Sequence, residues 1–223
     1  MTAGSHSSAL PSLGDGVTQL HRPAGRSLAL PQLVVNDLLT GDGETFWVDT
    51  RETATTYALS DLAPSERTLR GVHIARAFTA YQHHTLVCKL VAQATPETNL
   101  LVVPEIDALY ADDDVPEYEG EDLLTASLTI LRELATSLGV RVLVTSAGTH
   151  LSQLVAAHAD TEITCTETAL GFHYEAPDFE TLVYWGDGFW QTTIPYWVEL
   201  FGTVDEFDPV IAAADNGWFD AEA

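Results

Sequence analysis

Four side chains of the kinds that bind transition metals lie close together near the middle of the sequence. His73 precedes the adjacent pair His83 and His84, and Cys88 follows this pair. Imidazole nitrogens and thiolates are the usual ligands of zinc, which takes four ligands in a tetrahedral arrangement. However, we expect residues 84–93 to be helical, and neighbouring residues on a helix point in different directions. One ion would not reach both adjacent histidines, so the sequence predicts no metal site.

A serine and a histidine with the side chains of a nucleophile and a base lie at Ser146 and His150. The G-x-S-x-G turn that exposes a catalytic serine is missing around them, so we interpret the pair as a chance arrangement. The acidic run 112–114 offers oxygen ligands to a cation, but a solvated loop is the simpler interpretation. Neither feature predicts a catalytic residue.

Short apolar runs alternate with amphipathic stretches along most of the chain, which predicts strands alternating with helices. Strands separated by helices form βαβ units and a mostly parallel sheet, so the expected fold is α/β with helices flanking a central sheet. The last runs have hairpin spacing and predict antiparallel strands at one sheet edge. We expect strands at 17–21, 45–49, 99–103, 141–145, 161–166, 170–174, 182–185 and 190–194, helices at 27–39, 84–93 and 123–138, and a loop at 107–122.

The charge balance is strongly acidic. The sequence has 33 acidic and 9 basic residues, a formal net charge of −24, and Lys89 is its only lysine. Such a charge repels itself in the compact state, but molar salt shortens the Debye length to about 3 Å and removes most of that penalty. This composition predicts a halophilic, archaeal-type protein that functions in concentrated salt. The alternative is an acidic protein that mimics nucleic acid or binds basic partners.

The sequence also predicts the cellular location of the protein and its domain organisation. We find neither a signal peptide nor an apolar run of about 18 residues, so we expect a cytoplasmic protein with no membrane span. Cys88 and Cys165 each lie in an apolar run and are predicted to be buried free thiols. We expect a flexible segment at 1–13, one core domain at 14–202 and an acidic tail at 203–223.

Three segments in a fixed order carry a resemblance to a known family. They are residues 16–27, residues 46–51 followed by 72–84, and residues 99–110, the last followed by a long helix and a strand. The most specific piece is Ile74-Ala-Arg-Ala-Phe78 with Gln82 and His83 behind it. Over residues 14–195 the chain resembles the ATPase core of the archaeal RecA/RadA-type recombinases, including the smaller RadB-like paralogues. This resemblance implies a RecA-like P-loop NTPase fold with ATP and Mg²⁺ as cofactors.

The phosphate-binding motif of that family is only partly present. The family pattern is G-x-x-x-x-G-K-[ST], in which backbone N–H groups surround the phosphates and the hydroxyl holds Mg²⁺. The matching positions are Leu20, Gly25, Arg26 and Ser27, so the first glycine is missing and an arginine replaces the lysine. An arginine is longer and forked, and it is a poor substitute at a site shaped for an ammonium group. Gly25, Arg26 and Ser27 would form a degenerate nucleotide site that could still hold an anion.

The other positions to which the resemblance gives a catalytic role are substituted as well. Arg51 stands where the family has the glutamate that activates water, and Pro104 stands where it has the aspartate that supports Mg²⁺. Ser146 lies in the sensor run, which lacks the amide side chains of the family. Acids that could compensate in a shifted arrangement are Glu52, Glu105 and Asp107.

These departures predict a pseudo-ATPase with no catalytic residues and no required cofactor. The leading hypothesis is an accessory binding protein in DNA recombination or repair, whose partner is an active RecA-family ATPase or a second copy of the chain. One alternative is an active ATPase with a rebuilt site, and another is a scaffold with an unrelated role. The run 111–121 replaces the arginines of the family's DNA-binding loop by acids, so direct DNA binding stays open.

Aromatic residues in the C-terminal part of the chain indicate further burial or a protein interface. We expect most of them to be buried, and Trp218 and Phe219 in the acidic tail form a candidate docking motif. The aromatic residues of this part that precede the acidic tail are Trp185, Phe189, Trp190, Tyr196, Trp197 and Phe201.

Overall fold

The fold is that of a computed structural model, which describes residues 10–23, 25, 27–50, 56–169, 171–176, 179–186 and 189–192. For residue 56 and for residues beyond 178 the description covers the backbone alone. The two ends of the chain, residues 1–9 and 193–223, lie outside the described residues. Residues 10–13 of the predicted flexible segment are described, and Leu10 and Leu13 are buried in the core under the helix Ala29–Thr40. For the rest of that segment, for the acidic tail and for a docking motif at Trp218 and Phe219, the predictions stay predictions.

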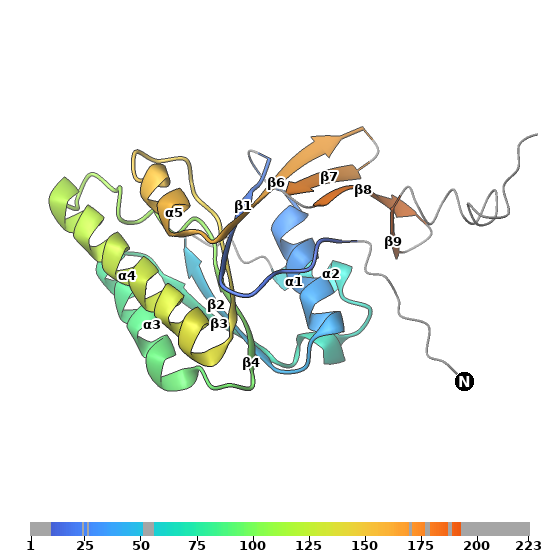
Figure 1. Cartoon of the computed structure of the whole chain (residues 1–223), viewed down its shortest axis with the longest axis horizontal. Helices are drawn as coiled ribbons and strands as arrows, with labels where there is room; N and C mark the ends of the chain where they lie inside the picture. Colours follow the sequence, from blue (N-terminus) through green and yellow to red (C-terminus); the bar gives the residue numbers. More distant parts are fainter. Residues whose placement is uncertain are drawn as a thin grey trace, which may run out of the picture.

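The described strands form a single nine-stranded sheet in the order β3-β2-β4-β5-β1-β6-β7-β8-β9 (Figure 1). The first six of these strands pair in parallel, whereas β7, β8 and β9 are added in antiparallel fashion. The prediction of an α/β fold with a mostly parallel sheet and antiparallel edge strands is confirmed. The strands are β1 (Val17–His21), β2 (Glu44–Thr50), β3 (Val72–Ala77), β4 (Thr98–Val103), β5 (Arg141–Val144), β6 (Thr161–Thr168), β7 (Gly171–Ala176), β8 (Phe179–Gly186) and β9 (Phe189–Thr192).

Helices cover both faces of the sheet. Helices α1 (Ala29–Thr40) and α2 (Thr56–Leu62) lie on one face, and α3 (Ala80–Gln93), α4 (Glu117–Leu138) and α5 (Ser152–His158) lie on the other (Figure 1). A short 3₁₀ turn, Glu66–Leu69, precedes β3. All six residues of β4 are buried, as expected of a strand covered on both faces. Alternation along β1 sends Val17 into the core under α3 and α4 and Leu20 into the core under α1.

The longest helix begins earlier than its apolar pattern indicated. We expected a loop over residues 107–122, but α4 begins at Glu117, so this prediction is wrong for its last six residues. Glu117 and Glu119 lie in the first turn, where the helix dipole favours negative charge. The end of the helix is as predicted, because Gly139 adopts the left-handed conformation with φ 67° and donates its N–H to the Ala135 carbonyl.

The two cysteines differ in their environment. Cys165 on β6 is buried, and burial raises the pKa of its thiol to about 12. Cys88 is exposed on α3, so the prediction that it is buried is wrong. The apolar run around Cys88 belongs to an amphipathic helix, whose buried residues include Val87 and Leu90. Among the described residues, no helix is long and apolar enough to cross a membrane.

A buried ion pair fastens α1 to the sheet. The Asp37 carboxylate near the end of α1 lies 2.6 Å from a guanidinium nitrogen of Arg141 and accepts a hydrogen bond of 2.5 Å from the Asn99 amide. Arg141 also donates to the amide oxygen of Asn99, which closes a three-membered cluster between α1, β4 and β5. Burial raises the pKa of Asp37, and the charge of Arg141 opposes that effect. Arg141 and the Asn99 amide thus offset part of the cost of burying this carboxylate.

Candidate functional site

The carboxyl ends of the parallel strands bring together residues that are far apart in the sequence. Arg22 follows β1, Glu105 follows β4, and Ser146 follows β5. These three strands are neighbours in the sheet, with β5 between β4 and β1. Open α/β sheets bind their ligands at this edge, outside the carboxyl ends of the strands. This edge is therefore the candidate functional site.

An ion pair between Arg22 and Glu105 crosses the site. One guanidinium nitrogen of Arg22 donates to the Glu105 carboxylate, and the other donates to the Gly25 carbonyl at 2.8 Å. Both side chains are about one-fifth exposed, so the pair is largely screened from solvent. Arg22 thus contacts a second residue of the loop after β1, Gly25, and joins that loop to the turn after β4.

Glu105 has an unusual backbone conformation. Its φ is 47°, and it is the only described non-glycine residue with a positive φ. The Glu105 N–H donates to the hydroxyl of Thr145 at 2.8 Å, and the next N–H, of Ile106, donates to the Thr145 carbonyl at 3.0 Å. Left-handed backbone costs about 1 kcal/mol or more in a residue with a Cβ, so these bonds hold the turn in place. The turn directs the carboxylate toward Arg22.

Three further site residues identified from the sequence fall in this region. Gly25 has a φ of 81°, which suits a glycine, and the Ser27 hydroxyl accepts a hydrogen bond from Ala29 N–H at 3.2 Å. Pro104 is buried, and its carbonyl accepts a hydrogen bond of 2.7 Å from the Thr50 hydroxyl. Predictions for Arg26, Arg51 and Glu52 concern positions outside the described residues.

Asp107 organises the loop that follows β5. Its buried carboxylate accepts hydrogen bonds from the Ala147 N–H at 2.6 Å, the Ser146 hydroxyl at 2.8 Å and the Thr149 hydroxyl at 2.6 Å. The Thr149 N–H and the Ser152 hydroxyl donate to the same carboxylate at 3.2 and 3.3 Å. Burial would raise the pKa of Asp107, but these hydrogen bonds together lower it below its ordinary value. The Asp107 oxygens are thus engaged in holding residues 146–152.

The adjacent histidines belong to a hydrogen-bonded chain. His83 Nδ1 lies 2.7 Å from the Tyr110 hydroxyl, which lies 2.8 Å from the Ser127 hydroxyl. His84 Nδ1 lies 2.9 Å from the same Ser127 hydroxyl. Within the part of the chain that the structure describes, no group of three or more His, Cys, Asp or Glu side chains could hold a metal ion. The sequence predicted that the two histidines point in different directions, but it did not indicate that Tyr110 and Ser127 join them by hydrogen bonds.

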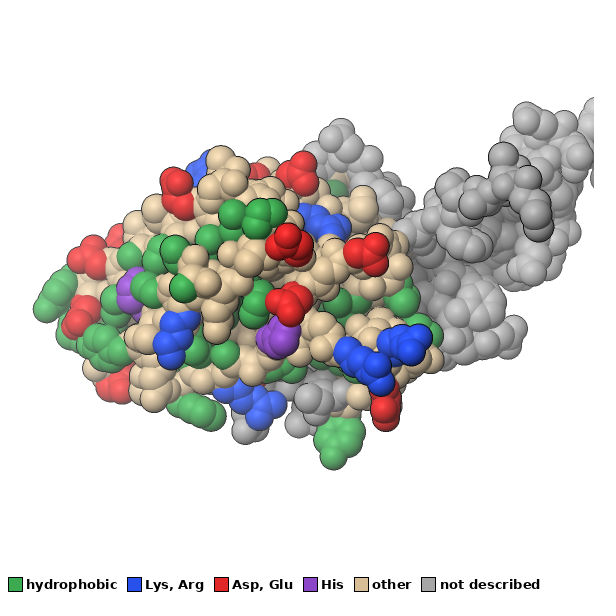
Figure 2. Space-filling view, turned by 90° about the horizontal axis from the view of Figure 1, so that it is seen from below, with side chains coloured by type: hydrophobic (Ala, Val, Ile, Leu, Met, Phe, Trp, Pro, Cys, Tyr) green, Lys and Arg blue, Asp and Glu red, His purple; other side chains and the backbone are tan. Residues whose placement is uncertain are grey.

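A shallow groove of about 460 Å³ lies where β3 meets α3. Phe78 and Tyr81 line it with 64% and 50% of their surface exposed, and Arg76 and Lys89 line it too. Toward the end of the molecule formed by α3 and α4, Figure 2 shows hydrophobic side chains beside isolated basic ones. Large exposed aromatic side chains are unusual on a free surface and are enriched at protein interfaces.

Part of this edge was predicted from the sequence. Glu105, Asp107 and Ser146 were identified as candidate residues and all three lie there, whereas Arg22 was missed. A comparison with protein-family models finds no match for this chain, and a comparison with curated proteins finds none either. The class that the fold and the site define is thus an α/β protein with a candidate site at the carboxyl edge of its sheet.

Proposed function

We propose that this chain is a catalytically inactive RecA/RadA-like paralogue that acts as an accessory binding protein in DNA recombination or repair. The strand order β3-β2-β4-β5-β1, all parallel, is compatible with a RecA-like core. The observation that carries the proposal is the Arg22–Glu105 pair, which occupies the edge where the family would hold phosphates and Mg²⁺. The family resemblance rests on the sequence segments and remains an expectation.

The pair bears directly on the chemistry. A general base must accept a proton from water, and a carboxylate that already accepts a hydrogen bond from a guanidinium has that oxygen engaged. Arg22 uses its guanidinium on Glu105 and on the Gly25 carbonyl, so both groups are already engaged within the protein. Pro104, at the end of β4, has no side chain that can bind a metal. Phosphate binding and water activation are therefore both impaired at this edge.

The binding role draws on the groove between β3 and α3. Its exposed Phe78 and Tyr81 provide apolar contact area, and Lys89 places a basic group on a chain with a net charge of −24. Arg76 also lines the groove, where it pairs with Asp49 at 3.3 Å. An acidic protein surface, such as that of another halophilic protein, would complement the Lys89 ammonium group. A protein partner is thus favoured over direct binding to DNA, whose contacts depend on many more Lys and Arg side chains.

The active-ATPase alternative is favoured by one observation, the position of Glu105. Its carboxylate lies beside the loop after β1, where a shifted acid would have to lie in order to serve a bound nucleotide. Binding of Mg²⁺ would then have to separate Glu105 from Arg22.

We expect no ATP turnover above the buffer background in molar KCl with Mg²⁺, measured as phosphate release. Glu105→Gln, which keeps the size of the side chain and removes its charge, is expected to give the same background rate. The proposal is wrong if the wild-type protein releases phosphate catalytically. A loss by a factor of about 100 or more in Glu105→Gln, typical when a general base is removed, would then assign that activity to Glu105. Asp113→Asn, at an exposed residue away from the site, is the matched control for a loss of one negative charge.

A further inference from the structure

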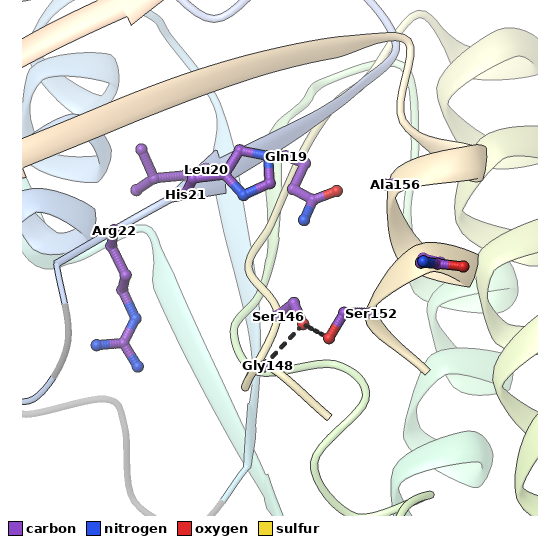
Figure 3. Close-up of a pocket in the computed structure, with 9 residues that line it drawn as sticks. Gln19, Leu20, His21, Arg22, Ser146, Gly148, Ser152 and Ala156 are labelled. Carbon is purple, nitrogen blue, oxygen red and sulfur yellow. Dashed lines mark hydrogen bonds between the residues drawn. The ribbon is translucent and has the colours of Figure 1, made fainter. Parts of the chain in front are cut away.

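A cavity of about 300 Å³ lies between the carboxyl end of β1 and α5 (Figure 3). Gln19 projects into it from β1, while Ser146 and Ser152 lie opposite, joined to each other by a hydrogen bond of 2.9 Å. Gly148 and Ala156 complete this side of the cavity without filling it. The volume is at the lower end of the range for small-molecule sites, which suits a ligand of one or two rings.

Gln19 carries a buried amide oxygen without a partner. The residue is 2% exposed, and its Oε1 accepts no hydrogen bond from any described residue. The residue pairs with Val144 of β5 and Glu162 of β6, so its backbone is fixed in the middle of the sheet. Alternation along β1 places its side chain on the same face as that of Val17, toward α5. A buried amide oxygen without a hydrogen bond is costly, and a donor placed in the cavity would remove that cost.

The charged groups near the cavity are already neutralised. Arg22 lines the mouth, but its guanidinium is committed to Glu105 and to the Gly25 carbonyl, and in Figure 3 it extends apart from the two serines. Ser146 and Ser152 stand in front of the Asp107 carboxylate, which receives the hydroxyl hydrogen of Ser146 at 2.8 Å. Among the described residues that line it, the cavity therefore offers the Gln19 and Gln153 carboxamides and two serine hydroxyls, while His21 contacts Glu162 and Arg22 is paired with Glu105. A charged ligand would find no counter-ion there.

We propose that this cavity binds a small, neutral, planar ligand that presents a hydrogen-bond donor and acceptor side by side. A carboxamide forms a two-point contact with such an edge, as Asn and Gln do with adenine. A nucleobase and a primary carboxamide share this chemistry. Gln19 lies on the same face of the sheet as Val17 and α5, whereas Gly25 and Ser27 precede α1 on the other face. The proposal does not depend on whether the protein hydrolyses ATP.

Adenine, nicotinamide and nicotinate are suitable probes, tested in molar KCl by ligand-observed saturation-transfer NMR. We expect adenine, nicotinamide or both to receive saturation from the wild-type protein. Nicotinate has the ring of nicotinamide with a carboxylate in place of the amide, and its binding is expected to be at least 10-fold weaker. A stronger response from adenine would identify a nucleobase as the natural class, and a stronger response from nicotinamide would identify a carboxamide.

Two variants connect that binding to the cavity. Gln19→Leu removes the amide with little change of volume and is expected to abolish binding while the melting temperature stays equal or rises. Ala156→Leu leaves Gln19 intact, fills the cavity, and is expected to abolish binding as well. Gln93→Leu, at an exposed residue at the end of α3, is the control and is expected to bind like the wild type.

Two results would overturn the proposal. The first is the absence of saturation transfer from both adenine and nicotinamide at millimolar concentration, which would mean that the cavity holds only water. The second is binding that survives in both Gln19→Leu and Ala156→Leu, which would place the ligand elsewhere. If Gln19→Leu fails to fold, Ala156→Leu alone decides between these outcomes.

Discussion

Replacing Arg141 by alanine is expected to lower the free energy of unfolding by about 3 to 5 kcal/mol, the usual cost of removing one partner of a buried ion pair. Asp37 is 2% exposed in the wild-type protein, and without Arg141 only the Asn99 amide would remain to stabilise its charge. The cluster joins α1 to β4 and β5, so its loss would weaken the packing of α1 on the sheet. Denaturant unfolding in molar KCl measures the change.

Two comparisons test the cause of that loss. Arg132→Ala removes an exposed arginine that pairs with Asp160 at 3.1 Å, and it is expected to cost at most about 1 kcal/mol. Adding Asp37→Asn to Arg141→Ala is expected to restore part of the stability, because the buried charge is then gone. Equal losses in Arg132→Ala and Arg141→Ala would contradict the role assigned to the buried pair.

The pH dependence of the Arg141→Ala variant follows from the raised pKa of Asp37. A carboxyl group whose folded pKa lies above its unfolded pKa binds a proton more readily in the folded protein. Its charge therefore destabilises the fold above the raised pKa, and this penalty disappears as the pH falls toward the unfolded value. Without Arg141 the pKa of Asp37 rises further, so the variant should recover part of its deficit on acidification.

Acidification from pH 6.5 to pH 4 is expected to cost the wild-type protein about 3 kcal/mol through His83 alone. His83 is completely buried, and burial lowers its pKa from 6.5 to about 4, with a smaller contribution from the charge of His84. Between these two pH values the unfolded chain binds a proton at His83 that the folded protein does not. The stability is therefore fully present above pH 6.5 and is lost as the pH falls toward 4.

His83→Gln tests this expectation, because glutamine can still contact the Tyr110 hydroxyl but does not titrate. The quantity to compare is the difference in unfolding free energy between pH 7 and pH 4.5, in the variant and in the wild type. We expect the variant to lose markedly less stability over this interval. His150→Gln, at an exposed histidine, is the control and is expected to follow the wild type. Identical pH profiles for His83→Gln and the wild type would show that His83 does not carry the effect.

The sequence predicted most of the sheet because its strands are short apolar runs with clear boundaries. The limits of β1 and the buried character of β4 follow directly from this pattern. The start of α4 did not, because Glu117 to Asp122 is acidic and polar and has the composition of a loop. The helix dipole makes those acids favourable at its first turn, which the apolar pattern could not indicate. Helices α2 and α5 have only seven residues each, too few to show a period.

The candidate site was less accessible from the sequence. Arg22 and Glu105 meet only because β1 and β4 end at the same edge with β5 between them, and no local pattern encodes that order. Gln19 could have been identified from the sequence, because it is a polar residue within a predicted strand. Asp107 was identified as a possible compensating acid, but the loop it holds could be recognised only in three dimensions. The catalytic substitutions at Arg51 and Pro104 remain predictions that rest on the resemblance.

The most direct test of the central claim, that the phosphate site has been lost, compares Mg-ATP with adenosine in thermal unfolding experiments in molar KCl. One-site linkage gives about 2.7 kcal/mol of stabilisation when the ligand reaches 100 times its dissociation constant, so phosphate binding would be visible. We predict that Mg-ATP raises the melting temperature no more than adenosine does at the same concentration. A larger, saturable shift with Mg-ATP that Arg26→Ala abolishes would contradict this account and favour the active ATPase.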